Sequence, residues 1–182
     1  MEQTRLLRSH RSVRRYAPEA IPENVLFDIV ETARWTGSAK NVQPWEVVVV
    51  RERPTLEALA RCGRYAEHLA GAQAAVVLVM EDARWAFDCG RLAQNVQLAA
   101  WVHGVGSCIG TLAPEENEAR VKELLGIPAG RWVRQSVALG YPADARAHLF
   151  SAEPDTGARG LALGRKPMDA FASWERYGQR RG

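Results

Sequence analysis

The apolar positions of the chain fall into short uninterrupted runs that alternate with longer segments in which apolar residues recur at helical spacing. Residues 45–50 and 74–80 are nearly all apolar and rich in Val. Runs of this length and composition predict strands that are buried on both faces. Residues 132–139 predict a third strand, which Gly140 closes.

Helical spacing of apolar residues predicts helices between these strands. The first begins near Pro22, and others cover residues 54–62, 85–102 and 114–125, with Gly126 ending the last of them. The longest of these segments has apolar side chains most of the way round the helix, which is typical of a helix buried in a core or an interface. Strands that alternate with helices predict an α/β or α+β domain.

The length and composition narrow the class of protein. The chain has 182 residues, of which 47% are hydrophobic and 25% are charged. These values are typical of a globular protein, and we expect a single domain over residues 1–182. They exclude a disordered chain, a collagen-like repeat and a disulfide-stabilised miniprotein. The longest apolar run is too short to cross a bilayer, and no apolar signal segment follows the N-terminus, so we expect no membrane partner.

Cysteine, histidine and serine residues form no familiar chemical motif. Cys62, Cys89 and Cys108 include no CxxC pair, which favours a reducing, cytoplasmic setting without a disulfide framework. No two His or Cys residues have the spacing of metal ligands, so no metal is expected. No Ser lies in a nucleophile elbow, and no catalytic side chain is predicted. His103, after the long helix, is interpreted as a helix C-cap.

Basic residues gather near both ends of the chain, within residues 5–15 and 159–181, although the net charge is only +3. Two basic ends can surround one anion or can form a nucleic-acid surface. The small net charge and the absence of a recognisable nucleic-acid module favour the first interpretation, so no nucleic-acid partner is expected.

A glycine-rich segment, Gly104 to Gly110, resembles a dinucleotide-binding fingerprint only superficially. Its spacing is GxGxxxG, which is one residue too long, and it follows a predicted helix rather than a strand. Both differences argue against a Rossmann site.

Three further segments carry candidate chemistry. Residues 10–16 bring guanidinium groups and a hydroxyl close together in the sequence, which suits the binding of a phosphate. The alternative interpretation is a solvated basic helix end. Residues 38–45 include Asn and Gln amides, which both donate and accept and so suit a heterocycle edge; the alternative is a polar turn before a strand. Residues 164–168 read GRKPM, which alone is an ordinary basic tail.

Together these segments resemble the FMN-dependent nitroreductase family. The motifs are RSxR at Arg11, SxxNxQPW at Ser38, the glycine-bracketed GxGSCIG at Gly104, LGYP at Leu139 and GRKP at Gly164. Their order and spacing fit the family over nearly the whole chain.

The resemblance implies a three-layer α+β fold, in which helices flank a mixed, mostly antiparallel sheet. It also implies a homodimer with domain-swapped arms and two FMN molecules at the interface. The long helix would then supply much of the dimer core. Residues 143–164 have few periodic signals and are either an arm over the partner subunit or a loose loop.

The resemblance also implies a set of cofactor-binding residues. Arg11, Ser12 and Arg14 would hold the phosphate and ribityl chain, and Arg14 would lie near the N1–O2 edge of the flavin. His10 stands where many family members have another arginine. A loop from the partner subunit would contribute Ser38, Ala39, Asn41 and Gln43. A backbone segment near the flavin N5–O4 edge would contribute Cys108, Ile109 and Gly110. A C-terminal segment would bind the phosphate through Arg165 and Lys166.

The implied activity is hydride transfer in a ping-pong reaction. NADH or NADPH would reduce FMN, and a small planar acceptor of the nitroaromatic or quinone type would then bind the same face. The candidates for reading the flavin pyrimidine edge are Arg64 and His68. Alternatives are specialised flavin chemistry (reductive dehalogenation, flavin cleavage or azoline dehydrogenation), a flavin-binding protein without turnover, and a nucleic-acid binder.

Overall fold

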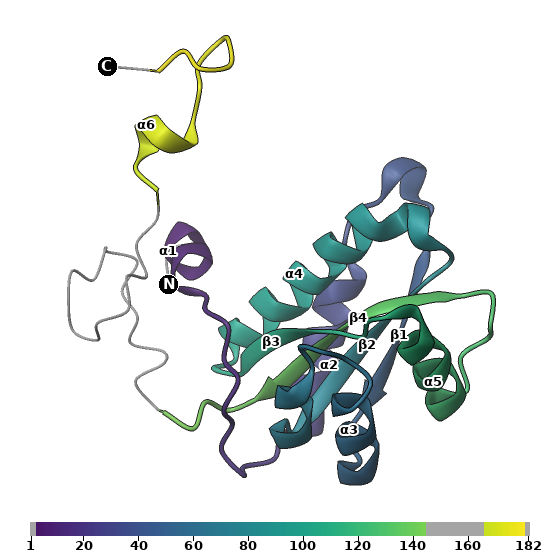
Figure 1. Ribbon diagram of the computed structural model, residues 1–182. Helices are drawn as coiled ribbons and strands as arrows, with labels where there is room; N and C mark the ends of the chain where they lie inside the picture. Colours follow the sequence, from purple (N-terminus) through teal and green to yellow (C-terminus); the bar gives the residue numbers. More distant parts are fainter. Residues whose placement is uncertain (1–2, 145–165, 181–182) are drawn as a thin grey trace. The chain divides into compact units, whose positions relative to one another are not determined.

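The computed structural model of the chain describes residues 3–144 and 166–180. The chain divides into two compact units, Met1–Leu149 and Phe150–Gly182. The first unit holds the sheet and most of the helices (Figure 1). The described part of the second unit contains one short helix, α6 (Met168–Phe171), followed by a turn. That the chain forms a single domain stays a prediction.

A four-stranded antiparallel sheet forms the centre of the first unit. Its strands are β1 (Trp45–Val50), β2 (Ala74–Met80), β3 (Gly106–Thr111) and β4 (Trp132–Gly140), in the order β1-β2-β4-β3. All three pairings are antiparallel. A mixed sheet was expected. Among the described residues, the parallel pairing is one isolated bridge, between Ser12 and Ser107.

The prediction that residues 45–50 are buried on both faces is wrong. β1 lies at an edge of the sheet, and Val49 is 39% exposed. β2 lies inside the sheet, and all of its residues are buried. An edge strand has only one neighbour and less cover from the helices. A run of valines is compatible with either place, so the pattern alone does not distinguish them.

β3 is a strand that the apolar pattern did not predict. Its sequence, GSCIGT, consists mostly of small residues. Small residues are poor strand formers by themselves, but they let other parts of the chain approach closely. Pairing with β4 along its full length, from Gly106 opposite Gly140 to Thr111 opposite Gln135, makes this segment a strand.

Helices cover both faces of the sheet, which confirms the three-layer α+β architecture (Figure 1). On one face, α2 (Glu23–Arg34) and α4 (Ala86–Val102) pack over a core that includes Ile29, Val76 and Val96. The other face is covered by three elements: α3 (Arg53–Ala60), the 3-10 helix η2 (Glu67–Gly71) and α5 (Glu115–Leu125).

The helix boundaries agree closely with the sequence signals. Pro22 precedes α2, and Gly126 ends α5 in the left-handed conformation with φ 67°. His103 is the C-cap residue of α4, as predicted, and its imidazole lies 2.7 Å from Asp28 Oδ2. A helix that was not predicted, α1 (Gln3–Ser9), begins the described chain. Two further 3-10 helices are η1 (Ala39–Asn41) and η3 (Ala83–Trp85).

No helix in the described part of the chain combines the length and the hydropathy needed to cross a membrane. In the second unit, Lys166 is exposed just before α6, and Ser173 Oγ accepts a hydrogen bond from Gly178 N at 3.0 Å. Arg165 and nearly all of the expected arm, residues 145–164, lie outside the described residues.

Candidate functional site

The first predicted motif forms an extended segment, residues 11–17, that we call the strap. Its first part runs along the outer edge of β3, where Val13 N donates to Ser107 O at 2.8 Å. Its second part pairs with the residues that follow β4, where Ala17 N donates to Tyr141 O at 2.8 Å. The strap is thus tied to the sheet by backbone hydrogen bonds at both ends.

Two glycines give the strap room to lie against the sheet. Gly106 and Gly140 face each other across β3 and β4, and we call them the glycine notch. A Cβ atom at Gly106 would lie 2.8 Å from Val13 Cβ, and one at Gly140 would lie 2.8 Å from Tyr16 Cγ and Cδ1. These approaches are shorter than carbon atoms tolerate, so any side chain in the notch would displace the strap.

Docking into the notch fixes which strap side chains face outward. Val13 is buried, and the Tyr16 hydroxyl donates to Val13 O at 2.6 Å. Burial is the main reason that the pKa of Tyr16 is raised, so this phenol stays protonated and keeps donating. Ser12 and Arg14, on either side of Val13, are exposed. The strap therefore presents the Ser12 hydroxyl and the Arg14 guanidinium from a fixed backbone.

The start of the motif rests on the last turn of α4. Trp101 is buried, and its Nε1 donates to Ser9 Oγ at 3.0 Å. The ring of His10 meets the Trp101 ring edge to face at 5.7 Å, and His10 Nε2 lies 3.5 Å from Ser107 Oγ. Burial, followed by the charge of Arg11, lowers the pKa of His10. His10 is therefore mostly neutral at neutral pH.

The Arg11 guanidinium binds backbone carbonyls of its own segment, and the side chain of Cys108 is buried. Arg11 Nη1 donates to Arg8 O at 2.6 Å and to His10 O at 2.8 Å. Cys108 is buried on β3, and burial raises the pKa of its thiol although Arg14 and Ser12 partly oppose the shift. A protonated, buried thiol is a poor nucleophile.

A cavity of about 600 Å³ lies beside the strap, and we call it the basic cavity. Its lining residues come from the strap, from the segment around η2 and from β3: Arg14, Arg64, Tyr65, Glu67, His68 and Ile109. Two guanidinium groups and one carboxylate leave an excess of positive charge at neutral pH. Such a cavity favours an anionic or electron-rich ligand.

The wall formed by residues 64–68 is held against β3 by close contacts. Gly63 lies so close to Thr111 O that a Cβ atom there would collide with this oxygen. His68 Nε2 donates to Cys108 O at 3.4 Å, and burial lowers the pKa of this imidazole. Arg64 and His68 were candidates from the sequence, whereas Tyr65 and Glu67 were not. Gly63 is the signal in the sequence that marks this close approach.

The predicted backbone segment on β3 contributes one side chain to the basic cavity. Ile109 is 38% exposed and lines the cavity. Gly110 faces the core instead, where a Cβ atom would lie 3.0 Å from Ser136 Oγ. Of the three residues predicted here, only Ile109 is on the cavity surface.

The predicted partner-subunit loop is exposed and lies outside the lining of the basic cavity in this chain. Lys40, Asn41 and Gln43 all have positive φ angles, between 52° and 56°. Ser38 Oγ accepts a hydrogen bond from Gln43 N at 2.8 Å, and Asn41 O accepts one from Gln43 Nε2 at 3.2 Å. Left-handed backbone costs about 1–2 kcal/mol for each non-glycine residue. Strain of this kind is typical of loops whose conformation serves a function.

A larger cavity, of about 870 Å³, lies between α5 and the start of β4. It shares no lining residue with the basic cavity. Its buried Glu118 accepts hydrogen bonds from Val133 N at 3.0 Å and Lys122 Nζ at 2.8 Å, and Arg131 pairs with Glu46. These four charged side chains form ion pairs with one another, whereas Arg134, which also lines the cavity, has a buried Nε without a hydrogen-bond partner among the described residues.

The fold and the site together define an α+β protein whose sheet edge carries a basic cavity next to an arginine-rich strap. Comparison with known proteins agrees with this description. The model of the Nitroreductase family matches residues 7–83 and 65–141. A protein of Archaeoglobus fulgidus that bears the names NADH dehydrogenase and NAD(P)H nitroreductase is 33% identical over 148 residues, covering 77% of this chain and 85% of the relative.

Solved structures show the same fold. A structure from Bacteroides thetaiotaomicron with the same double name superposes with a TM-score of 0.78 at 24% identity, covering 94% of this chain and 96% of that one. An FMN-dependent nitroreductase from Clostridium difficile superposes with a TM-score of 0.74 at 24% identity, covering 78% and 88%. The chain therefore belongs to the Nitroreductase family, which confirms the resemblance seen in its motifs.

Proposed function

We propose that this protein is an FMN-dependent oxidoreductase that takes a hydride from NADH or NADPH and passes it to a small planar acceptor. The observation that carries the proposal is the basic cavity of this Nitroreductase-family fold. Arg14 and an exposed apolar side chain, Ile109, both line it. The names of the relatives, NAD(P)H nitroreductase and FMN-dependent nitroreductase, support this choice of cofactor and donor.

The residues around the basic cavity fit FMN. A flavin presents an apolar ring, a polar pyrimidine edge and a phosphate, so it requires apolar contact, directional donors and cations together. Ile109 supplies apolar contact, and the Arg14 guanidinium supplies both directional donors and a cation. The cavity of about 600 Å³ is within the usual size of cofactor sites.

The role of the protein is to hold the cofactor and to stabilise negative charge. When bound, FMN supplies the hydride-accepting and hydride-donating ring. The Arg14 guanidinium would lie beside the bound ring and would stabilise negative charge there, because a fixed cation in a partly desolvated site favours an anion. Arg11, Ser12 and His10 would bind the phosphate and ribityl chain in this proposal. Water supplies the proton to the acceptor, so no side chain acts as a general acid.

We propose further that the site is completed in a homodimer. Phe87 on α4 is 77% exposed and Trp35 after α2 is 76% exposed. Large exposed aromatic side chains are typical of interfaces. The loop of residues 38–43 follows Trp35 directly and presents Asn41 to solvent. If a second subunit covers these aromatic rings, Asn41 and its neighbours in one subunit would contact the flavin that is bound by the other subunit.

Flavin titrations test the cofactor assignment. FMN and riboflavin would be titrated against the apoprotein, with flavin fluorescence as the readout. Arg14→Gln is expected to weaken FMN binding by about tenfold to a hundredfold, because a charge-assisted hydrogen bond contributes about 1.5–3 kcal/mol. Arg15→Gln is the matched control, since Arg15 is an exposed arginine of the same strap outside the cavity lining. Equal losses in the two variants, or no flavin binding by the wild-type protein, would contradict the assignment.

Mixed dimers test whether the loop acts on the partner subunit. One subunit carries Arg14→Gln and the other carries Asn41→Asp. If each site takes Arg14 from one subunit and Asn41 from the other, one site in the hybrid keeps both native residues and the other site has lost both. The hybrid is expected to bind one FMN per dimer with native affinity. Two equally weakened sites would show that Arg14 and Asn41 serve the same subunit.

A further inference from the structure

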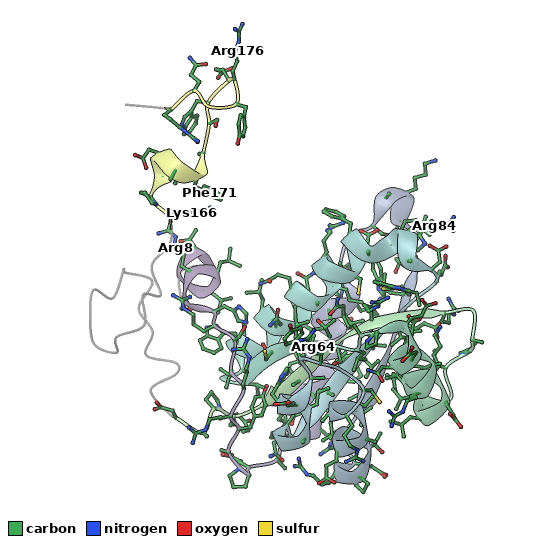
Figure 2. The ribbon with its side chains drawn as sticks, in the orientation of Figure 1. Arg8, Arg64, Arg84, Lys166, Phe171 and Arg176 are labelled. Carbon is green, nitrogen blue, oxygen red and sulfur yellow. The ribbon has the colours of Figure 1, made fainter. Side chains whose placement is uncertain are left out.

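Arg64 is an exposed arginine at the wall of the basic cavity (Figure 2). Its guanidinium lies over the ring of Tyr65, 5.9 Å from the ring centroid, and Tyr65 itself is 69% exposed. The one carboxylate in the cavity lining belongs to Glu67, and it forms no ion pair with Arg64 in the described structure.

Comparison with the other stacked arginines of the described chain shows what is unusual about Arg64. Arg34 lies over Trp35 and pairs with Glu31, Arg84 lies over Trp85 and pairs with Asp82, and Arg91 lies over Phe87 and pairs with Asp88. These three pairs have N–O distances of 2.6, 3.0 and 3.3 Å. Among the described residues, Arg64 is thus the stacked arginine that lacks a carboxylate partner.

The position of Arg64 at the basic cavity indicates what kind of ligand could pair with its guanidinium. An exposed guanidinium beside an exposed aromatic ring combines a bidentate donor fork with a flat apolar surface. A planar aromatic molecule that carries a carboxylate or a phosphate satisfies both at once. The one carboxylate of the lining, on Glu67, is outnumbered by Arg14 and Arg64, so the local field also favours an anion.

We propose that Arg64 binds the anionic group of an aromatic substrate at the mouth of the basic cavity, and that the Tyr65 ring packs against the substrate ring. The proposal rests on the proposed function, because it assigns a substrate class to the same site. The anion belongs either to the acceptor, as a carboxylate or phosphate, or to the nicotinamide donor, as the additional phosphate that distinguishes NADPH from NADH.

The first experiment compares two acceptors of nearly equal shape, 4-nitrobenzoate and the neutral 4-nitrobenzamide, with the FMN-loaded dimer. Arg64→Gln is expected to lower kcat/KM for 4-nitrobenzoate about fivefold, which is within the range of a partly exposed ion pair. The value for 4-nitrobenzamide should change little, and Arg64→Lys should recover part of the loss. Arg84→Gln is the matched control, because Arg84 (Figure 2) is also an exposed arginine, and it is stacked on the ring of Trp85.

A second arm identifies the source of the anion. NADPH and NADH are compared as donors with 4-nitrobenzamide as the acceptor. If Arg64→Gln lowers the preference for NADPH while both acceptors respond alike, the donor carries the anion. If Arg64→Gln changes neither the acceptor ratio nor the donor ratio, or if Arg84→Gln changes them equally, the proposal is wrong.

A binding measurement separates this proposal from the proposed function. Benzoate and benzamide are titrated into the FMN-loaded protein by calorimetry, which requires no turnover. Benzoate binding that is tighter than benzamide binding, and that loses this advantage in Arg64→Gln, supports the anion site even if no nitro compound is reduced. Equal binding of the two probes by the wild-type protein, together with a donor ratio that Arg64→Gln leaves unchanged, contradicts it.

Discussion

The glycine notch makes the strap the most sensitive part of the site to a small substitution. In Gly140→Ala the new methyl group would lie 2.8 Å from two ring carbons of Tyr16. Tyr16 has little space to retreat, because its backbone is bridged to Pro142 and its hydroxyl donates to Val13 O. The ring must therefore move away from the sheet and take the strap with it.

The cost of this movement follows from two contributions. Overpacking a well-packed site costs about 1–3 kcal/mol, and loss of a hydrogen bond of the Tyr16 kind costs about 1 kcal/mol. Replacing glycine returns about 0.4–1 kcal/mol through the unfolded state. We expect a net loss of about 2 kcal/mol in the free energy of unfolding, equivalent to about 4–8 °C in Tm for a chain of this length.

The assay is thermal and urea unfolding at fixed protein concentration, combined with FMN titration. Gly130→Ala is the matched control, because a Cβ atom there would meet nothing within 4 Å. Gly140→Ala should also weaken FMN binding, since Arg14 is carried by the displaced strap. If Gly140→Ala and Gly130→Ala unfold alike and bind FMN alike, the notch does not position the strap.

Further predictions concern other contacts of the site and the fold. Trp101→Phe should destabilise the protein by about 1 kcal/mol in urea unfolding and weaken FMN binding, because Trp101 Nε1 holds the start of the strap. Glu118→Gln should lower the free energy of unfolding by about 3 kcal/mol, since it leaves a half-buried lysine without its counter-charge. The pKa values of His10 and His68 are lowered by burial, so the unfolded chain binds more protons in mildly acidic solution. The urea midpoint should therefore fall as the pH decreases through about 6.5.

Each of these predictions has an internal control. Trp85→Phe removes an indole N–H that is buried without a hydrogen-bond partner among the described residues, so it should cost less than Trp101→Phe. Glu123→Gln changes an exposed carboxylate of the same helix and should have little effect. His68→Gln should flatten the pH dependence of the urea midpoint. An unchanged slope would show that His68 is equally protonated in the folded and unfolded states.

Much of the fold could be predicted from the apolar pattern, because periodicity reports which faces are buried. The helix over residues 86–102 and the strand over residues 74–80 were found because burial shaped their entire sequences. The edge position of β1 could not be read in this way, since Val49 is compatible with either an edge or a central strand. β3 was missed because its small residues reflect the close approach of the strap and not a hydrophobic face.

The candidate site could be predicted only in part, for a related reason. The guanidinium groups of the strap are visible in the sequence because of their chemistry, and family resemblance gave them a context. The glycine notch was not visible, because Gly106 and Gly140 become neighbours only through the register of β3 and β4. Tyr65 and Glu67 reach the cavity wall only because Gly63 lets their segment approach β3.

The most direct test of the central claim is anaerobic reduction of the FMN-loaded protein by NADH and NADPH. The absorbance of oxidised flavin near about 450 nm is followed, and a nitroaromatic or quinone is then added after the donor has been consumed. The account predicts bleaching by at least one donor and full recovery of absorbance on addition of the acceptor. A bound flavin that stays oxidised with both donors would contradict it and favour a flavin-binding protein without this activity.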